Sequence, residues 1–311
     1  MYHGIMNVYK EPGYTSHDVV ARLRGILKQK KIGHTGTLDP AAEGVLPVCL
    51  GMGTRLCDML TDRTKTYEAV MLLGMTTDTQ DTTGEVLEDR HHAAMGLEEA
   101  AVTEAVLGYK GDYDQIPPMY SALKVDGKKL YELARAGKEV ERQARQVQIL
   151  EIRVDKVVLP RVWMTVTCSK GTYIRTLCHD IGGKLGCGGC MEHLTRTRVD
   201  RFDIKDSLRL DEIERIRDEG GLDTCILPVE TALEGYAGLK VLPEADSFLY
   251  NGNPCFKGQL AAGDGCLDGL EDGLRFRMYD SKGHFVGVYE YQDSRHWWKP
   301  WKMFLAAPEH T

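Results

Sequence analysis

Residues 33–51, GHTGTLDPAAEGVLPVCLG, limit what this chain can fold into, because glycines and a proline interrupt both helix and strand. Gly33 and Gly36 allow another segment or a ligand to approach the backbone closely. Pro40 drives the preceding residue, Asp39, towards extended backbone angles, so the Asp39 carboxylate sits on a backbone with little freedom. We therefore expect a rigid loop that presents this carboxylate.

The chemistry around Asp39 favours catalysis without a metal. Most aspartates that precede a proline form turns, and this structural role is the alternative. The chain has no HExxH or DxDxDG pattern, so a hydrolytic metal centre is poorly supported. A rigid, ionised carboxylate is suited to act as a nucleophile or to stabilise developing positive charge.

Length and composition are those of a globular protein in a reducing compartment. The chain has 311 residues, of which 42% are hydrophobic and 27% charged, which fits one large and one small domain. The first twenty residues contain no apolar run typical of a signal peptide or a membrane span. Nine cysteines without paired spacing indicate free thiols. We predict a cytoplasmic location.

Charge is distributed unevenly, although the net charge is −7. Basic residues outnumber acidic ones in two stretches, 21–34 and 170–201, whereas 78–89 and 264–272 are acidic. Each basic stretch alone would suit a solvated helix face. Two such stretches flanking one candidate site favour a ligand rich in phosphate.

The pattern of apolar residues predicts helices alternating with strands. Helical spacing follows the N-cap candidates Thr15 and Ser16, up to about Lys31, and follows Thr172 as a second N-cap. We also expect a helix over 97–107, and strands over 66–73, 163–168 and 194–202. Residues 115–145 form a basic excursion from the core. From about residue 239 short strands are expected, with a hairpin turn at 280–283.

Several motifs resemble the TruB family of RNA pseudouridine synthases. The first is GHTGTLDPAAEGVLPVCLG, and the others follow in matching order over residues 5–233: KEPGYTSHDVVARLR, KTYEAVMLLGMTTDTQDTTGEV, QIPPMYSALKVDGKKLYELARAG, CSKGTYIRTLCHDIGGKLG and ILPVETAL. The resemblance implies an α+β fold. Residues 1–235 would form a pseudouridine synthase catalytic domain with a central mixed, mainly antiparallel sheet flanked by helices. Residues 115–145 would be its RNA-gripping insertion, and 236–311 a small PUA-like β-barrel.

The resemblance also implies roles for individual residues. Asp39 would attack the target nucleotide, Tyr67 would stack on it or deprotonate near it, and Arg175 would pair with Asp39 and position it. His34 would stack within the RNA loop that the base has left, and Leu194 would wall the uracil pocket. Further substrate contacts would come from Lys65, Ile174, Lys124, Lys128 and Lys129. Taken singly, each of these residues also suits a structural role.

The implied reaction converts a uridine of tRNA into pseudouridine, at position 55 of the T-loop, by flipping the base out of its stack. No atoms are gained or lost, so no cofactor and no metal are expected. The partner would be the T-arm of tRNA, with no obligate protein partner and a monomeric enzyme. Whether Asp39 attacks the base, attacks the ribose or acts through an elimination stays open.

Other classes of function compete with this interpretation. The chain could be a non-catalytic RNA-binding or RNA-folding protein, or a synthase that depends on a guide RNA. A group of possible ligands suggests a zinc site, and its CxxC pair suggests thiol redox chemistry: Cys178, His179, Cys187, Cys190 and His193. With one CxxC and no second pair, buried thiols are the favoured interpretation.

Overall fold

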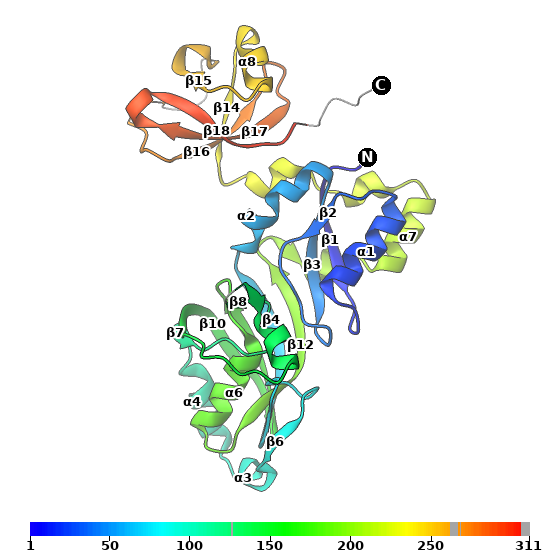
Figure 1. The fold of residues 1–311 in the computed structure, drawn as a ribbon, viewed down its shortest axis with the longest axis vertical. Coiled ribbons are helices and arrows are strands. Elements are labelled where there is room, and N and C mark those ends of the chain that lie inside the picture. Colours follow the sequence, from blue (N-terminus) through cyan, green and yellow to red (C-terminus); the bar gives the residue numbers. More distant parts are fainter. Residues whose placement is uncertain (126, 262–266, 268, 306–311) are drawn as a thin grey trace.

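The computed structural model describes residues 1–125, 127–261, 267 and 269–305. Figure 1 shows an elongated molecule: two halves of one large sheet lie one after the other, and a small C-terminal sheet lies beyond them. No helix in the described part of the chain combines the length and apolar character needed to cross a membrane.

The large sheet has nine strands, in the order β1-β3-β12-β4-β11-β10-β7, with β2 beside β3 and β13 beside β12. All neighbours are antiparallel except β12 and β3, which are parallel. The predicted mixed, mainly antiparallel sheet is confirmed. The strands are β1 (Gly4–Lys10), β2 (Ile32–His34), β3 (Glu43–Leu50), β4 (Lys65–Leu73), β7 (Gly111–Gln115), β10 (Arg145–Val158), β11 (Arg161–Cys168), β12 (Gly189–Val199) and β13 (Phe202–Asp203).

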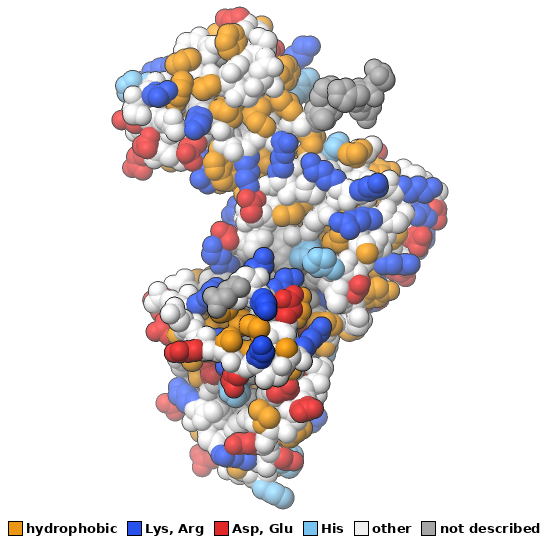
Figure 2. Space-filling view, in the orientation of Figure 1, with side chains coloured by type: hydrophobic (Ala, Val, Ile, Leu, Met, Phe, Trp, Pro, Cys, Tyr) orange, Lys and Arg blue, Asp and Glu red, His pale blue; other side chains and the backbone are white. Residues whose placement is uncertain are grey.

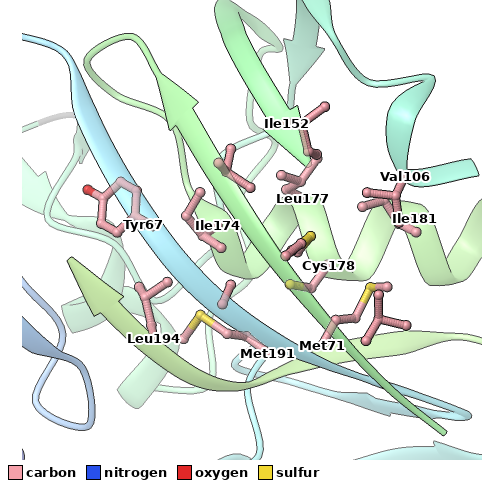
Figure 3. Packing of buried hydrophobic residues seen from close by; sticks show 14 of the residues in the cluster. Tyr67, Met71, Val106, Ile152, Ile174, Leu177, Cys178, Ile181, Met191 and Leu194 are labelled. Atoms are coloured by element: carbon pink, nitrogen blue, oxygen red, sulfur yellow. The ribbon is translucent and has the colours of Figure 1, made fainter. Parts of the chain in front are cut away.

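Helices cover each half of the sheet. Strand β4 buries every second side chain, from Lys65 to Leu73, because one face of the sheet is covered. Figure 3 shows residues of this core packing between the sheet and α6. The helices are α1 (Ser16–Leu27), α2 (Cys57–Thr61), α3 (His91–Met95), α4 (Glu99–Leu107), α5 (Leu130–Arg135), α6 (Ile174–Lys184), α7 (Leu210–Asp218) and α8 (Asp246–Tyr250).

The helix boundaries correct two expectations. Thr15 caps α1 as predicted, with a capping box to Asp18, but the helix ends at Leu27 and not near Lys31. The chain turns there because Lys28 adopts left-handed backbone angles, with φ of 49°. Thr172 does not cap α6, since its hydroxyl donates to the carbonyl of Ser169.

The C-terminal sheet has five strands in the order β14-β16-β17-β18-β15. The hairpin predicted at 280–283 is confirmed between β16 and β17, where the buried Asp280 carboxylate accepts the N–H groups of Lys282 and His284. Val288 and Phe304 share an apolar cluster with residues of the large sheet. The strands are β14 (Ala237–Lys240), β15 (Cys255–Phe256), β16 (Arg275–Tyr279), β17 (Phe285–Gln292) and β18 (Trp297–Met303).

Two small hairpins extend from the large sheet. They are β5 (Met75–Thr77) with β6 (Val86–Asp89), and β8 (Lys124–Val125) with β9 (Lys128–Lys129). The second belongs to the basic excursion 115–145 and leads into α5. The acidic segment 264–272 lies in part outside the described residues.

Candidate active site

The loop that carries Asp39 is fixed by hydrogen bonds to the start of the chain. The main-chain N–H of Leu38 donates to the Ser16 hydroxyl at 2.9 Å, and the N–H of Gly13 donates to the carbonyl of Pro40 at 2.9 Å. Contacts therefore hold the backbone on both sides of Asp39. The rigidity expected from Pro40 is supplemented by these tertiary bonds.

Lys10, at the end of β1, donates hydrogen bonds to the same loop. Its fully buried ammonium donates to the carbonyls of Ala42 at 2.5 Å and Pro40 at 3.2 Å. Burial lowers the pKa of Lys10 to about 8, and the nearby Asp39 carboxylate opposes this effect. Lys10 thus places a buried positive charge close to Asp39.

Arg175, on α6, holds the Asp39 carboxylate directly. Its Nε lies 2.9 Å from Asp39 Oδ2, and its Nη2 donates to Asp39 Oδ1 at 3.4 Å. The rest of the guanidinium donates to the carbonyls of Thr79 at 2.9 Å and Tyr120 at 2.8 Å. Only 5% of the Arg175 side chain is exposed, against 37% for Asp39. One face of the carboxylate is fixed while part of it stays open to a ligand.

Three predicted substrate contacts belong to one apolar wall. Tyr67, Ile174 and Leu194 are buried in the same core cluster as Leu38, and Figure 3 shows them at one end of it. Burial raises the pKa of the Tyr67 phenol to about 12. The phenol is therefore protonated at neutral pH, which favours stacking or hydrogen-bond donation over proton abstraction.

His34 and Lys65 lie close to the Asp39 loop. The His34 ring sits 5.5 Å from His17, edge to face, and burial lowers its pKa. A Cβ at Gly36 would lie 3.7 Å from Lys65 Cε. The Lys65 ammonium itself turns to the carbonyls of Thr61 and Arg63, and burial lowers its pKa to about 8.

The remaining predicted contacts lie on the β8–β9 hairpin. Lys124 and Lys128 are exposed, while Lys129 is half-buried with its ammonium 3.3 Å from the Tyr131 hydroxyl. The excursion also reaches the Asp39 site, since the carbonyl of Tyr120 accepts from Arg175. Figure 2 shows Lys and Arg side chains around the hollow between the two halves of the large sheet.

Sequence reasoning missed several polar groups of this site. Arg196 on β12 is 1% exposed and donates to the carbonyl of Gly36 in the Asp39 loop at 3.3 Å. Glu43 follows Asp39 by four residues, and its carboxylate accepts from the Tyr9 hydroxyl at 2.7 Å. Nothing in the sequence distinguishes these residues from ordinary surface charges, because their contacts depend on strand pairing.

The structure gives the zinc and thiol alternatives no support. Among the residues that it describes, no group of three or more His, Cys, Asp and Glu side chains could hold a metal ion. Burial raises the pKa of Cys178 and Cys187, and that of Cys190 to about 11. A reactive thiol needs the opposite shift. All three thiols are buried, as the favoured interpretation expects.

The fold is shared with chains of known assemblies. A chain of an H/ACA ribonucleoprotein bound to a substrate RNA containing 2'-deoxyuridine aligns with a TM-score of 0.71 and 24% identity, covering 98% of this chain and 86% of that one. A chain of a Cbf5-Nop10-Gar1 complex aligns with a TM-score of 0.70 and 26% identity, covering 97% and 85%. Together with the site, this likeness defines a pseudouridine synthase fold.

Sequence comparison identifies the family. Residues 24–174 match the N-terminal domain of the TruB family pseudouridylate synthases, and 175–234 match the tRNA pseudouridylate synthase B C-terminal domain. A tRNA pseudouridine synthase B of Lachnoclostridium phytofermentans is 51% identical over 97% of this chain and 100% of its own. Another, of Alkaliphilus oremlandii, is 44% identical over 83% and 84%. The chain belongs to the TruB family, an enzyme family that isomerises uridine.

Proposed function

We propose that this enzyme converts the uridine at position 55, in the T-loop of tRNA, into pseudouridine. The N1–C1' bond of the nucleotide breaks, the base turns, and a C5–C1' bond forms. The proton on C5 is lost and N1 gains one, so the reaction balances without a cofactor. The observation that carries the proposal is the Asp39 carboxylate, fixed by Arg175 yet partly exposed.

Each part of the site has a role in this proposal. Flipping the base out of its stack in the RNA costs a few kcal/mol, and the base then packs against the apolar wall of Tyr67, Ile174 and Leu194. Arg175 keeps the Asp39 carboxylate in a fixed orientation, because its planar fork makes two-point contact. Asp39 then attacks the base, attacks the ribose or assists elimination at the sugar.

The basic surface offsets the cost of flipping by binding phosphates. Lys124, Lys128 and Lys129 on the β8–β9 hairpin would grip the T-arm, with Lys65 and His34 near the everted nucleotide. We assign residues 1–235 to the catalytic domain and 236–311 to a PUA-type RNA-binding barrel. The protein would act as a cytoplasmic monomer without an obligate partner.

The test is to incubate the purified protein with an unmodified tRNA transcript and map pseudouridine by position. We expect modification at position 55 alone, and none with Asp39→Asn. Modification at another position would contradict the T-loop assignment. Binding of tRNA without modification would favour the RNA-folding alternative, and modification only after addition of a guide RNA would favour the guide-dependent one.

A further inference from the structure

Arg196 lies on β12, next to β3. At this pair of strands the half of the large sheet that contains β1, β2 and β3 joins the half that contains β4, β11, β10 and β7. Strands β12 and β3 pair in parallel through two residue pairs, Thr195 with Glu43 and Arg196 with Gly44. On its other side, Arg196 pairs with Tyr67 of β4. The backbone of Arg196 therefore connects the strand that follows the Asp39 loop with the strand that carries Tyr67.

The side chain of Arg196 reaches back to the Asp39 loop. Its Nε donates to the carbonyl of Val45 at 2.7 Å, its Nη1 to that of Thr37 at 3.4 Å, and its Nη2 to that of Gly36 at 3.3 Å. Gly36 and Thr37 come directly before Leu38 and Asp39 in the chain. The planar guanidinium of Arg196 thus holds the two residues that come before Leu38 and Asp39 against β3.

We propose that Arg196 is a positioning residue, which fixes the Asp39 loop relative to β4 and thereby sets the distance between the Asp39 carboxylate and the Tyr67 hydroxyl. The proposal rests on the roles given above to Asp39 and Tyr67. Misplacement of a reacting group by about 1 Å costs about 100-fold in rate. A lysine would keep the charge, but its donors all leave one nitrogen, whereas the guanidinium reaches the three carbonyls from three separate atoms.

The experiment compares Arg196→Lys with the wild type and with a matched control, Arg161→Lys. Arg161 also makes a two-point contact, to Glu192 at 2.7 and 2.8 Å, but it is half exposed and lies at the far end of β11. The substrate is a tRNA transcript labelled with tritium on C5 of uridine, because pseudouridine formation releases that hydrogen. Single-turnover rate constants at saturating enzyme are measured beside the Kd for RNA.

We expect Arg196→Lys to lower the single-turnover rate constant at least about 10-fold, with the Kd for RNA changed less than about two-fold. The Arg161→Lys control should match the wild type in both. Guanidinium chloride, far below denaturing concentrations, should restore part of the rate of Arg196→Ala, whereas ammonium chloride should not. Such rescue would distinguish positioning by the fork from a general loss of stability.

A rate constant of Arg196→Lys equal to that of the wild type would overturn the proposal. Weaker RNA binding at an unchanged rate would overturn it too, because Arg196 would then be a binding residue. If Arg196→Lys and Arg196→Gln both lose their cooperative thermal unfolding, the role is purely structural. Tritium release does not depend on which uridine reacts, so a target other than position 55 would contradict the proposed function and leave this comparison valid.

Discussion

Replacement of Arg175 by lysine is the sharpest test of how Asp39 is held. Arg175 makes two contacts to the Asp39 carboxylate and one each to the carbonyls of Thr79 and Tyr120. All three guanidinium nitrogens take part in these four contacts. A lysine nitrogen approaches from one point, so at least one carboxylate contact and one carbonyl contact must be lost.

The magnitude follows from these lost contacts. A hydrogen bond to a charged group contributes about 1.5–3 kcal/mol, and the value is reduced here because 37% of the Asp39 side chain is exposed to water. We expect a loss of about 2–3 kcal/mol in the transition state, which corresponds to about 30- to 150-fold in rate. Charge is conserved, so the loss would come from geometry.

The assay is single-turnover release of tritium from C5-labelled tRNA transcript, with the Kd for RNA measured in parallel. The rate constant should fall while the Kd stays close to that of Arg161→Lys and the variant still unfolds cooperatively. A rate constant for Arg175→Lys within about two-fold of the wild type would refute the reasoning, because two-point contact would then be unnecessary. An equal fall in RNA affinity would place Arg175 in substrate binding.

Three further predictions use the same assays. Asp39→Asn should lower the single-turnover rate constant at least about 1000-fold and keep RNA binding, because the amide is neither nucleophile nor anion. A smaller loss of rate would contradict the prediction. Because burial raises the pKa of Tyr67 to about 12, Tyr67→Phe should lower the rate without altering the pH–rate profile below about pH 10. Loss of an ionisation near neutral pH would count against this prediction. Gly44→Ala should destabilise the fold by at least about 2 kcal/mol in denaturant unfolding. Gly44 has φ of +105°, and an added Cβ would lie 2.3 Å from the carbonyl oxygen of Arg196 on β12. An unchanged unfolding midpoint would disprove the prediction.

The sequence predicted the residues of the central ion pair better than their surroundings. Asp39 and Arg175 stand in motifs whose order resembles a known family, so their pairing could be expected although they are 136 residues apart. The other hydrogen-bond acceptors of Arg175 are main-chain carbonyls of Thr79 and Tyr120. Carbonyls carry no side-chain signal, because every residue has one, and only the folded backbone brings them together.

Arg196 was missed for a different reason. It stands in the segment HLTRTRV with Arg198, and alternation alone would place both side chains on one face of the strand. A register shift between Arg196 and Arg198 separates them, so that the first is buried and the second exposed. Single bulges of this kind depend on pairing with β4, which the sequence of β12 does not encode by itself.

The buried cations explain how a protein of net charge −7 can hold an anionic substrate close to the Asp39 carboxylate. Three buried cations contact the Asp39 loop: Lys10, Arg175 and Arg196. Each also donates to main-chain carbonyls. Burying a charge is costly unless it is hydrogen-bonded. The carbonyls that accept these hydrogen bonds belong to the Asp39 loop and to the segments that pack around it. The same contacts therefore compensate for desolvation and set the geometry. Because buried charges are screened far less than surface charges, the potential at Asp39 persists at salt concentrations that weaken the exposed lysines of the β8–β9 hairpin.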